Sequence, residues 1–109
     1  MSEETIDWTG ESGTKYRYWM HPIGTGFRDA PGNYIYAKEV RPGYWTPVYV
    51  GQTNSLGRRL SNHEKENEAK RNGATQIHAH TSGGGEAARL AEEEDLCRKW
   101  KPACNELLV

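Results

Sequence analysis

The chain has 109 residues, of which 35% are hydrophobic and 27% are charged, and its formal net charge is −1. This length accommodates one domain with a single core, and the small negative charge excludes a general electrostatic attraction to nucleic acid. No apolar run approaches the roughly 20 residues of a membrane span, and residues 1–13 are acidic and polar, unlike a secretory signal. We therefore expect a cytoplasmic protein that makes no contact with a membrane.

The first two segments differ in character. Residues 1–13 lack hydrophobic periodicity, so we expect a flexible N-terminal segment, followed by one domain over residues 14–109. Residues 15–23 are rich in Tyr and Trp, which are common in strands. This composition favours an additional strand at the edge of a sheet.

The next two strands are predicted to form an antiparallel hairpin. Residues 33–38 alternate aromatic and apolar positions, and residues 47–51 form the second strand. A Pro-Gly pair at 42–43 supplies a turn between them. Because side chains alternate along a strand, Tyr34 and Tyr36 are expected on the same face of the sheet.

A helix is predicted after the hairpin. Thr53, Asn54 or Ser55 can cap it, and the pattern favours a helix to about Arg71, where Asn72-Gly73 ends it. A third strand over residues 74–80 and a second helix over residues 86–100 follow, separated by a glycine-rich connection. The resulting order β-β-α-β-α, with the extra N-terminal strand, indicates a small α+β domain in which helices flank an antiparallel sheet. The buried stripe expected for the second helix is Leu90, Leu96, Cys97 and Trp100.

The first predicted helix carries groups that bind phosphate. Arg59 and His63 are four residues apart, so on a continuous helix they would share one face. The planar guanidinium of arginine donates two parallel hydrogen bonds to phosphate oxygens. These residues and the nearby tyrosines are consistent with a phosphate site, and the alternative is a solvated basic helix face.

The second predicted helix carries four consecutive acids at residues 92–95. Helical spacing places either Glu93 or Glu94 toward the core, where a carboxylate needs a charged partner or a metal. Oxygen ligands completed by water match Mg²⁺ or Mn²⁺ better than zinc. The alternative is a salt bridge between Arg89 and Glu93.

These motifs, in this order, closely resemble the GIY-YIG nuclease family. Residues 32–34 (Gly-Asn-Tyr) stand where the family has its first Gly-Ile-Tyr, and residues 49–51 (Tyr-Val-Gly) stand for Tyr-Ile-Gly. Residues 56–59 resemble its Leu-x-x-Arg element, and His63 stands where many members carry a histidine. The closing Glu, Pro and Asn pattern is matched by Glu93, Leu96, Pro102 and Asn105. One departure is Asn33, which replaces the usual aliphatic residue.

The resemblance implies a DNA endonuclease that depends on Mg²⁺ or Mn²⁺ and has low intrinsic sequence specificity. By that resemblance, Glu93 is the metal ligand, and Tyr34 or Tyr49 helps generate the attacking hydroxide, with Tyr34 slightly favoured. Arg59 steadies the charge on the phosphate, and His63 orients the reactants or relays the proton.

The same resemblance implies further contacts with the substrate. Arg58, Gly51, Lys65 and Asn105 are expected to bind it, and Asn105 to fix the geometry of the site. DNA is the expected partner, and a protein partner is expected to supply specificity. The alternatives are a nucleic-acid-binding module of the same fold without catalysis, and a nuclease that acts on RNA or single strands.

Overall fold

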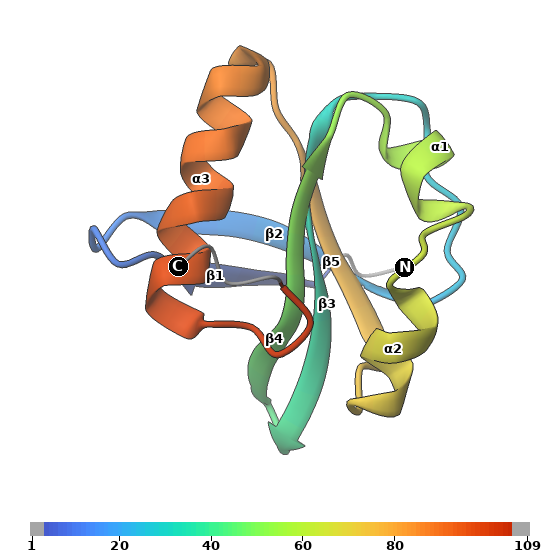
Figure 1. Cartoon of the computed structure of the whole chain (residues 1–109). Coiled ribbons are helices and arrows are strands. Elements are labelled where there is room, and N and C mark those ends of the chain that lie inside the picture. Colours follow the sequence, from blue (N-terminus) through green and yellow to red (C-terminus); the bar gives the residue numbers. More distant parts are fainter. Residues whose placement is uncertain (1–3, 106–109) are drawn as a thin grey trace.

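The computed structural model describes residues 4–105, which form an α+β fold of a curled five-stranded antiparallel sheet and three helices (Figure 1). The strand order across the sheet is β1-β2-β5-β3-β4. No helix in this part of the chain is long and apolar enough to cross a membrane. The strands are β1 (Thr5–Thr9), β2 (Lys15–Pro22), β3 (Gly32–Arg41), β4 (Tyr44–Thr53) and β5 (Gln76–Thr81), and the helices are α1 (Leu56–Leu60), α2 (Glu66–Arg71) and α3 (Gly85–Trp100).

The N-terminal region differs from the prediction. Residues 5–9 form β1, which pairs antiparallel with β2 over its whole length, so the expectation of a flexible segment is wrong there. Residues 1–3 lie outside the described residues. Trp8 supplies the physical reason, because its indole is 2% exposed and packs in the core. Since β1 covers the outer side of β2, β2 is an inner strand rather than the predicted edge strand.

The central hairpin is confirmed and is longer than predicted. β3 and β4 pair antiparallel, with Tyr34 opposite Gly51, and Gly43 (φ 82°) stands in the turn. β3 also pairs with β5, so it has a partner on both sides. Tyr34 and Tyr36 share a face, as alternation requires, and their rings lie 6.2 Å apart.

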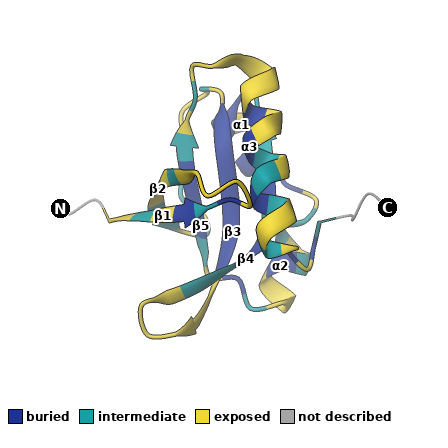
Figure 2. Ribbon diagram, turned by 90° about the vertical axis from the view of Figure 1, so that its left-hand side faces the viewer, coloured by how far each residue is buried: buried dark blue, intermediate teal, exposed yellow. Residues whose placement is uncertain are grey.

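The sheet separates two core clusters. On one face Tyr34 and Tyr36 pack with Leu56 and Leu60 under α1 and α2. On the other face Ile35 and its neighbours pack under α3, which lies chiefly against β4 (Figure 1). Colouring by burial shows the first part of β3 enclosed between these layers, while its end at the hairpin tip and the outer face of α3 are exposed (Figure 2).

The single helix predicted after the hairpin is two short helices. The Ser55 hydroxyl caps α1 by accepting the backbone N–H of Arg58, which confirms one of the predicted caps. The helix then ends at Leu60, where the Ser61 hydroxyl donates to the Arg58 carbonyl at 2.9 Å. Residues 61–65 turn toward the sheet, which buries His63 at 7% exposure. After α2, Asn72-Gly73 ends the helical region as predicted, with Gly73 at φ 99°.

The predicted extent of α3 is confirmed, but only part of its predicted buried stripe is buried. Leu96 is fully buried, whereas Leu90 is 45% exposed, which contradicts the prediction. Arg89 and Glu92 take the inward positions of the first turns. They do so because the facing sheet offers polar partners that a leucine could not use.

Candidate functional site

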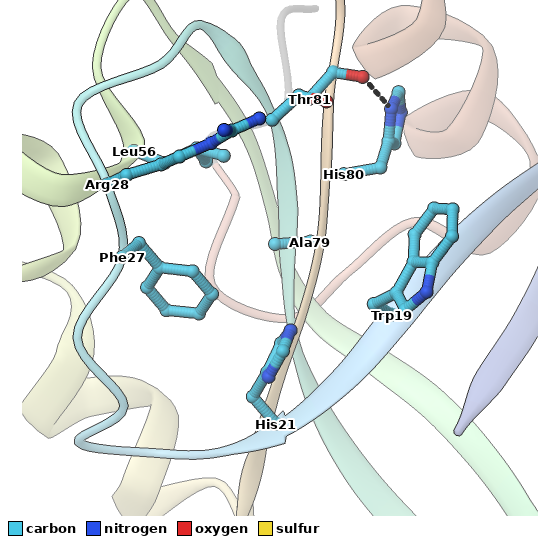
Figure 3. A pocket seen from close by; sticks show the side chains of 8 residues that line it. All are labelled: Trp19, His21, Phe27, Arg28, Leu56, Ala79, His80 and Thr81. Atoms are coloured by element: carbon cyan, nitrogen blue, oxygen red, sulfur yellow. Dashed lines mark hydrogen bonds between the residues drawn. The ribbon is translucent and has the colours of Figure 1, made fainter. Parts of the chain in front are cut away.

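Two hollows border α1. One, of about 390 Å³, lies among Trp19, Phe27, Arg28 and Leu56 (Figure 3). The other, of about 530 Å³, lies along residues 53–62 and includes both arginines of α1. The second hollow leads to the residues that the sequence singled out.

His63 and Tyr34 form the centre of the candidate site. The backbone N–H of Lys65 donates to Nδ1 of His63 at 3.0 Å, so the proton of the neutral imidazole lies on Nε2. Nε2 is 2.7 Å from the hydroxyl oxygen of Tyr34, and therefore donates to it. Burial, with the charge of Arg59, lowers the pKa of His63 to about 4, which keeps the ring neutral at pH 7. His63 reaches this place from the connection between α1 and α2, so the predicted shared helical face with Arg59 is wrong.

Three tyrosine rings surround His63. The ring centroids of Tyr34, Tyr36 and Tyr49 lie 5.4, 5.4 and 5.1 Å from that of the imidazole. Burial is the main cause that raises the pKa of all three phenols, so each holds its proton at neutral pH. Tyr36 differs from the others because its hydroxyl donates to Glu66 at 3.1 Å.

Gly51 gives Tyr34 the space for its ring. A Cβ built at Gly51 would lie 2.5 Å from both Cζ and the hydroxyl oxygen of Tyr34, and residue 51 is buried. Any larger residue would displace the phenol. The structure thus gives Gly51 a steric role in place of the predicted contact with the substrate.

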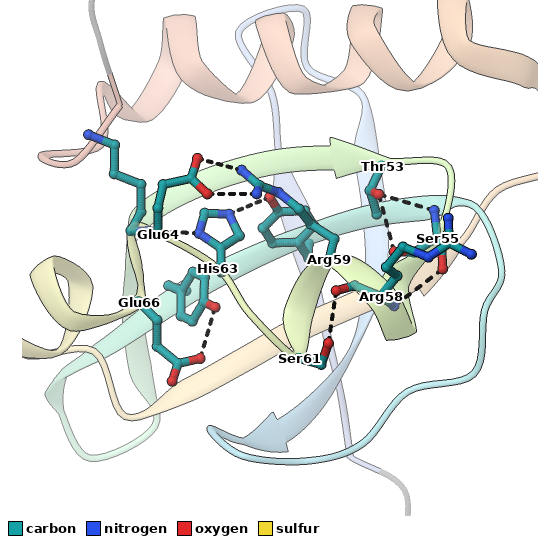
Figure 4. A network of polar contacts seen from close by, with 11 residues as sticks. Thr53, Ser55, Arg58, Arg59, Ser61, His63, Glu64 and Glu66 are labelled. Atoms are coloured by element: carbon teal, nitrogen blue, oxygen red, sulfur yellow. Dashed lines mark hydrogen bonds and ion pairs between the residues drawn. The ribbon is translucent and has the colours of Figure 1, made fainter.

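Arg59 lies beside both candidate phenols. Its NH1 and NH2 donate to the two carboxylate oxygens of Glu64 at 2.7 and 2.8 Å (Figure 4). Glu64 raises the pKa of Arg59 further, and hydrogen bonding to Arg59 lowers the pKa of Glu64 to about 2. Arg59 also opposes the effect of burial on the pKa of Tyr34 and Tyr49, which places its guanidinium close to both hydroxyls.

Glu64 was not singled out from the sequence. It lies five residues after Arg59, a spacing that would not bring the two together on a continuous helix. Only the break between α1 and α2 turns Glu64 back toward the guanidinium. A carboxylate thus occupies the fork that would receive a phosphate.

Glu93 approaches the site from α3. It is half-buried, whereas Glu94 is exposed and pairs with Arg98, so Glu93 is the inward one of the two alternatives. Burial raises the pKa of Glu93, and the backbone N–H of Gln52 opposes that shift. After burial, the negative charge of Glu93 is the largest cause that raises the pKa of Tyr49, and it makes a smaller contribution in the same direction at Tyr34. Glu93 belongs to α3, which covers the face of the sheet opposite the cluster that contains Tyr34 and Tyr36.

Glu93 is the candidate ligand for a divalent cation. Within residues 4–105 no cationic side chain forms an ion pair with Glu93, and the alternative salt bridge is not made because Arg89 Nε donates to Gln52 Oε1 at 3.0 Å. No three His, Cys, Asp or Glu residues of that part of the chain group as a metal site. Glu93 would thus hold Mg²⁺ or Mn²⁺ as a single carboxylate, with water and phosphate oxygens as the other ligands, a habit of Mg²⁺.

Asn105 is tied to β4. Its Oδ1 accepts the backbone N–H of Val50 and its Nδ2 donates to the Val50 carbonyl, both at 2.8 Å. Because Val50 lies between Tyr49 and Gly51, this pair of bonds supports the geometry of the site. That placement agrees with the expected positioning role of Asn105 and leaves its amide occupied rather than directed at a substrate.

Of the remaining predicted contacts, Arg58 is exposed in the second hollow, and the Lys65 side chain pairs with Glu68 at 3.5 Å. Asn33, the departure from the family motif, is fully buried on the opposite side of β3 from Tyr34. Its Nδ2 donates to the Arg89 carbonyl at 3.0 Å, while its Oδ1 has no partner. Asn33 therefore joins β3 to α3 one turn before Glu93.

Comparisons with models of protein families, with curated proteins and with solved structures find no match for this chain. The folded chain brings the rings of Tyr34, Tyr49 and His63 together, with Arg59 on α1 and Glu93 on α3.

Proposed function

We propose that this protein is a metal-dependent endonuclease of the GIY-YIG type that hydrolyses phosphodiester bonds in DNA with low sequence specificity. The main support is the hydrogen bond that Tyr34 accepts from His63, with the Arg59 guanidinium acting on the pKa of the same phenol. Helix α3 adds the half-buried carboxylate of Glu93, which forms no ion pair within residues 4–105. This set contains a proton acceptor, a phosphate clamp and a ligand for a divalent cation.

Arg59 binds the scissile phosphate. Its fork has the geometry for two phosphate oxygens and remains charged at every working pH. The carboxylate of Glu64 marks the position where those oxygens bind, and it must leave when the substrate arrives. Arg59 then neutralises the charge that grows on the phosphate as a water oxygen bonds to phosphorus and the bond to the leaving oxygen breaks.

Tyr34 takes the proton of the attacking water after its phenol has ionised and released its own proton to the solvent. Its oxygen receives the Nε2–H of His63 and lies beside Arg59, and both groups stabilise negative charge on that oxygen. Burial works in the opposite direction and raises the pKa of Tyr34 in the free protein. When bound at Glu93, Mg²⁺ or Mn²⁺ supplies the positive charge that favours ionisation of the phenols and offsets the phosphate charge. His63 orients Tyr34.

Plasmid cleavage tests the proposal. Wild-type protein with Mg²⁺ or Mn²⁺ is expected to nick plasmid DNA, and Glu93→Gln is expected to lose cleavage while keeping its fold and its affinity for DNA. Glu94→Gln is the matched control, because Glu94 is the exposed neighbour on the same helix. Equal behaviour of wild type and Glu93→Gln on duplex, branched and single-stranded DNA and on RNA would end the proposal.

The alternative is a nucleic-acid-binding module of this fold. The occupied fork of Arg59 and the raised pKa of Tyr34 favour it, since both describe a site closed in the free protein. Tight DNA binding by the wild type, with no cleavage in either metal, would support this alternative. Cleavage confined to RNA or single strands would instead change the substrate class and leave the mechanism in place.

A further inference from the structure

An aromatic groove lies on the α1/α2 face of the sheet, and the proposed function leaves it unused. It is the hollow of about 390 Å³ bordered by Trp19, His21, Phe27, Arg28 and Leu56 (Figure 3). Trp19 is 36% exposed, although β2 is an inner strand. His21 and Phe27 meet edge to face at 5.1 Å, which holds the wall opposite Trp19 in place.

The groove adjoins the candidate active site through α1. The backbone N–H groups of Leu56 and Gly57 donate to the carbonyls of Ala30 and Arg28, at 2.8 and 3.0 Å. The contact is so close that a Cβ at Gly57 would lie 2.3 Å from the Phe27 carbonyl oxygen. The groove wall and the helix therefore form one unit. Along this helix one turn, about 5 Å, separates the groove from the phosphate clamp.

The charges along this path suit a polyanion. Arg28 is exposed at the groove and Arg58 is exposed in the neighbouring hollow, so the two arginines precede Arg59 along one surface. Among the described residues that line the groove there is no carboxylate. The acid next to Arg28 is Asp29, which accepts a hydrogen bond from the Ser55 hydroxyl at 2.8 Å. An exposed indole and a guanidinium that line the same groove form a surface on which nucleic-acid bases stack.

We propose that this groove binds an unpaired base of a nucleic-acid strand, stacked on Trp19, while the phosphates of that strand pass Arg28 and Arg58 toward Arg59. The inference rests on the proposed function for the position of the cleaved bond. It specifies the substrate class as nucleic acid with a single-stranded segment adjoining the scissile phosphate. Stacking is tolerant of base identity, which agrees with low sequence specificity.

Binding to short oligothymidine tests the groove without any need for cleavage. In Glu93→Gln protein, oligothymidine is expected to quench tryptophan fluorescence, an oligomer of abasic residues with the same charge is expected to quench it much less, and Trp19→Leu is expected to remove this quenching. Trp19→Leu is expected to weaken binding of oligothymidine about tenfold, in line with the loss of one base–aromatic stack. Arg28→Ala should weaken it as well, with a shallower dependence on salt.

Matched controls lie at the tip of the β3–β4 hairpin. There the Arg41 guanidinium stacks on the exposed Tyr44 ring at 4.2 Å, so Tyr44→Leu and Arg41→Ala remove the same chemistry far from the groove. These variants should bind oligothymidine like the parent. Arg28 is a surface residue, so its variant keeps the test decisive even where Trp19→Leu folds poorly.

Three binding results would overturn the groove proposal. The first is unchanged binding of oligothymidine by both groove variants, and the second is equal weakening by the hairpin controls. The third is quenching of tryptophan fluorescence by an acidic peptide but not by oligothymidine. Failure of plasmid cleavage would leave the groove proposal standing as a binding site. Conversely, if wild type and Trp19→Leu cleave a blunt duplex and a duplex with a single-stranded extension equally well, the groove proposal fails and the endonuclease proposal survives.

Discussion

The hydrogen bond between His63 and Tyr34 has a defined direction, because Nδ1 of His63 accepts the backbone N–H of Lys65 and leaves Nε2–H to donate to the Tyr34 oxygen at 2.7 Å. Both ring nitrogens are therefore used. A neutral His63 with this pattern has no free lone pair with which to take a proton from water. In the proposed mechanism, Tyr34 accepts the proton once its phenol has ionised, and His63 orients the Tyr34 oxygen.

Removal of the Tyr34 hydroxyl tests this division of roles. Tyr34→Phe is expected to lower the rate of DNA cleavage by about 10²–10⁴, the usual range for a general base. Tyr36→Phe is the matched control, since the Tyr36 hydroxyl is occupied by Glu66. Single-turnover cleavage under saturating metal makes the comparison. If Tyr34→Phe retains nearly full activity while Tyr49→Phe does not, Tyr49 is the base.

Glu64 competes with the substrate for Arg59. Glu64→Gln removes the charge that now fills the guanidinium fork, so DNA is expected to bind several-fold more tightly, in keeping with the modest strength of an exposed ion pair. Glu68→Gln, which loses the weaker contact with Lys65 at 3.5 Å, should change affinity less. Titration of labelled duplex at low salt measures both. Weaker binding by Glu64→Gln would mean that Glu64 orients Arg59 rather than blocks it.

The stability of the fold should fall with acidification because of two buried histidines. Burial lowers the pKa of His63 and His78 from 6.5 to about 4 in the folded protein. Between pH 4 and pH 6.5 the unfolded chain binds more protons than the folded protein. The free energy of unfolding therefore falls as the pH falls from 6.5 toward 4, by on the order of 2 kcal/mol for each histidine.

His80 acts in the opposite sense. Burial lowers the pKa of His80, but hydrogen bonding to Glu92 outweighs burial and raises that pKa above its usual value. His80 therefore contributes stability that is lost as the pH rises. Urea unfolding between pH 7 and pH 4.5 measures the sum, and NMR titration of the three rings separates the parts. A His63 resonance that titrates near pH 6.5 in the folded protein would contradict the assignment.

Asn33 carries a cost that the family's aliphatic residue would avoid. Its Oδ1 is buried without a partner, and such an orphaned acceptor costs about 1–3 kcal/mol. Asn33→Ile removes that acceptor at the loss of one bond to the Arg89 carbonyl. We expect a midpoint of thermal unfolding equal to or above that of the wild type. A large fall would show that the bond to α3 outweighs the orphaned oxygen.

Much of the local structure follows from the sequence alone. Alternation along residues 33–38 places Tyr34 and Tyr36 on one face, and the Pro-Gly turn makes the hairpin antiparallel. Ser55 and Asn72-Gly73 mark a start and an end of the helical region because their side chains or backbone conformations suit those positions. Such features depend on neighbours within a few residues, so a linear pattern contains them.

The site itself was decided by tertiary contacts. By helical spacing alone, either Glu93 or Glu94 of α3 could face the core. Only the packing of that helix on β4 directs Glu93 inward, buries Glu92 and leaves Leu90 in solvent. The turn that brings Glu64 onto Arg59 and His63 onto Tyr34 exists because burying the imidazole among tyrosine rings outweighs continuing an exposed helix. Periodicity records which residues share a face, whereas the partner across the core is chosen by packing between segments that are distant in the chain.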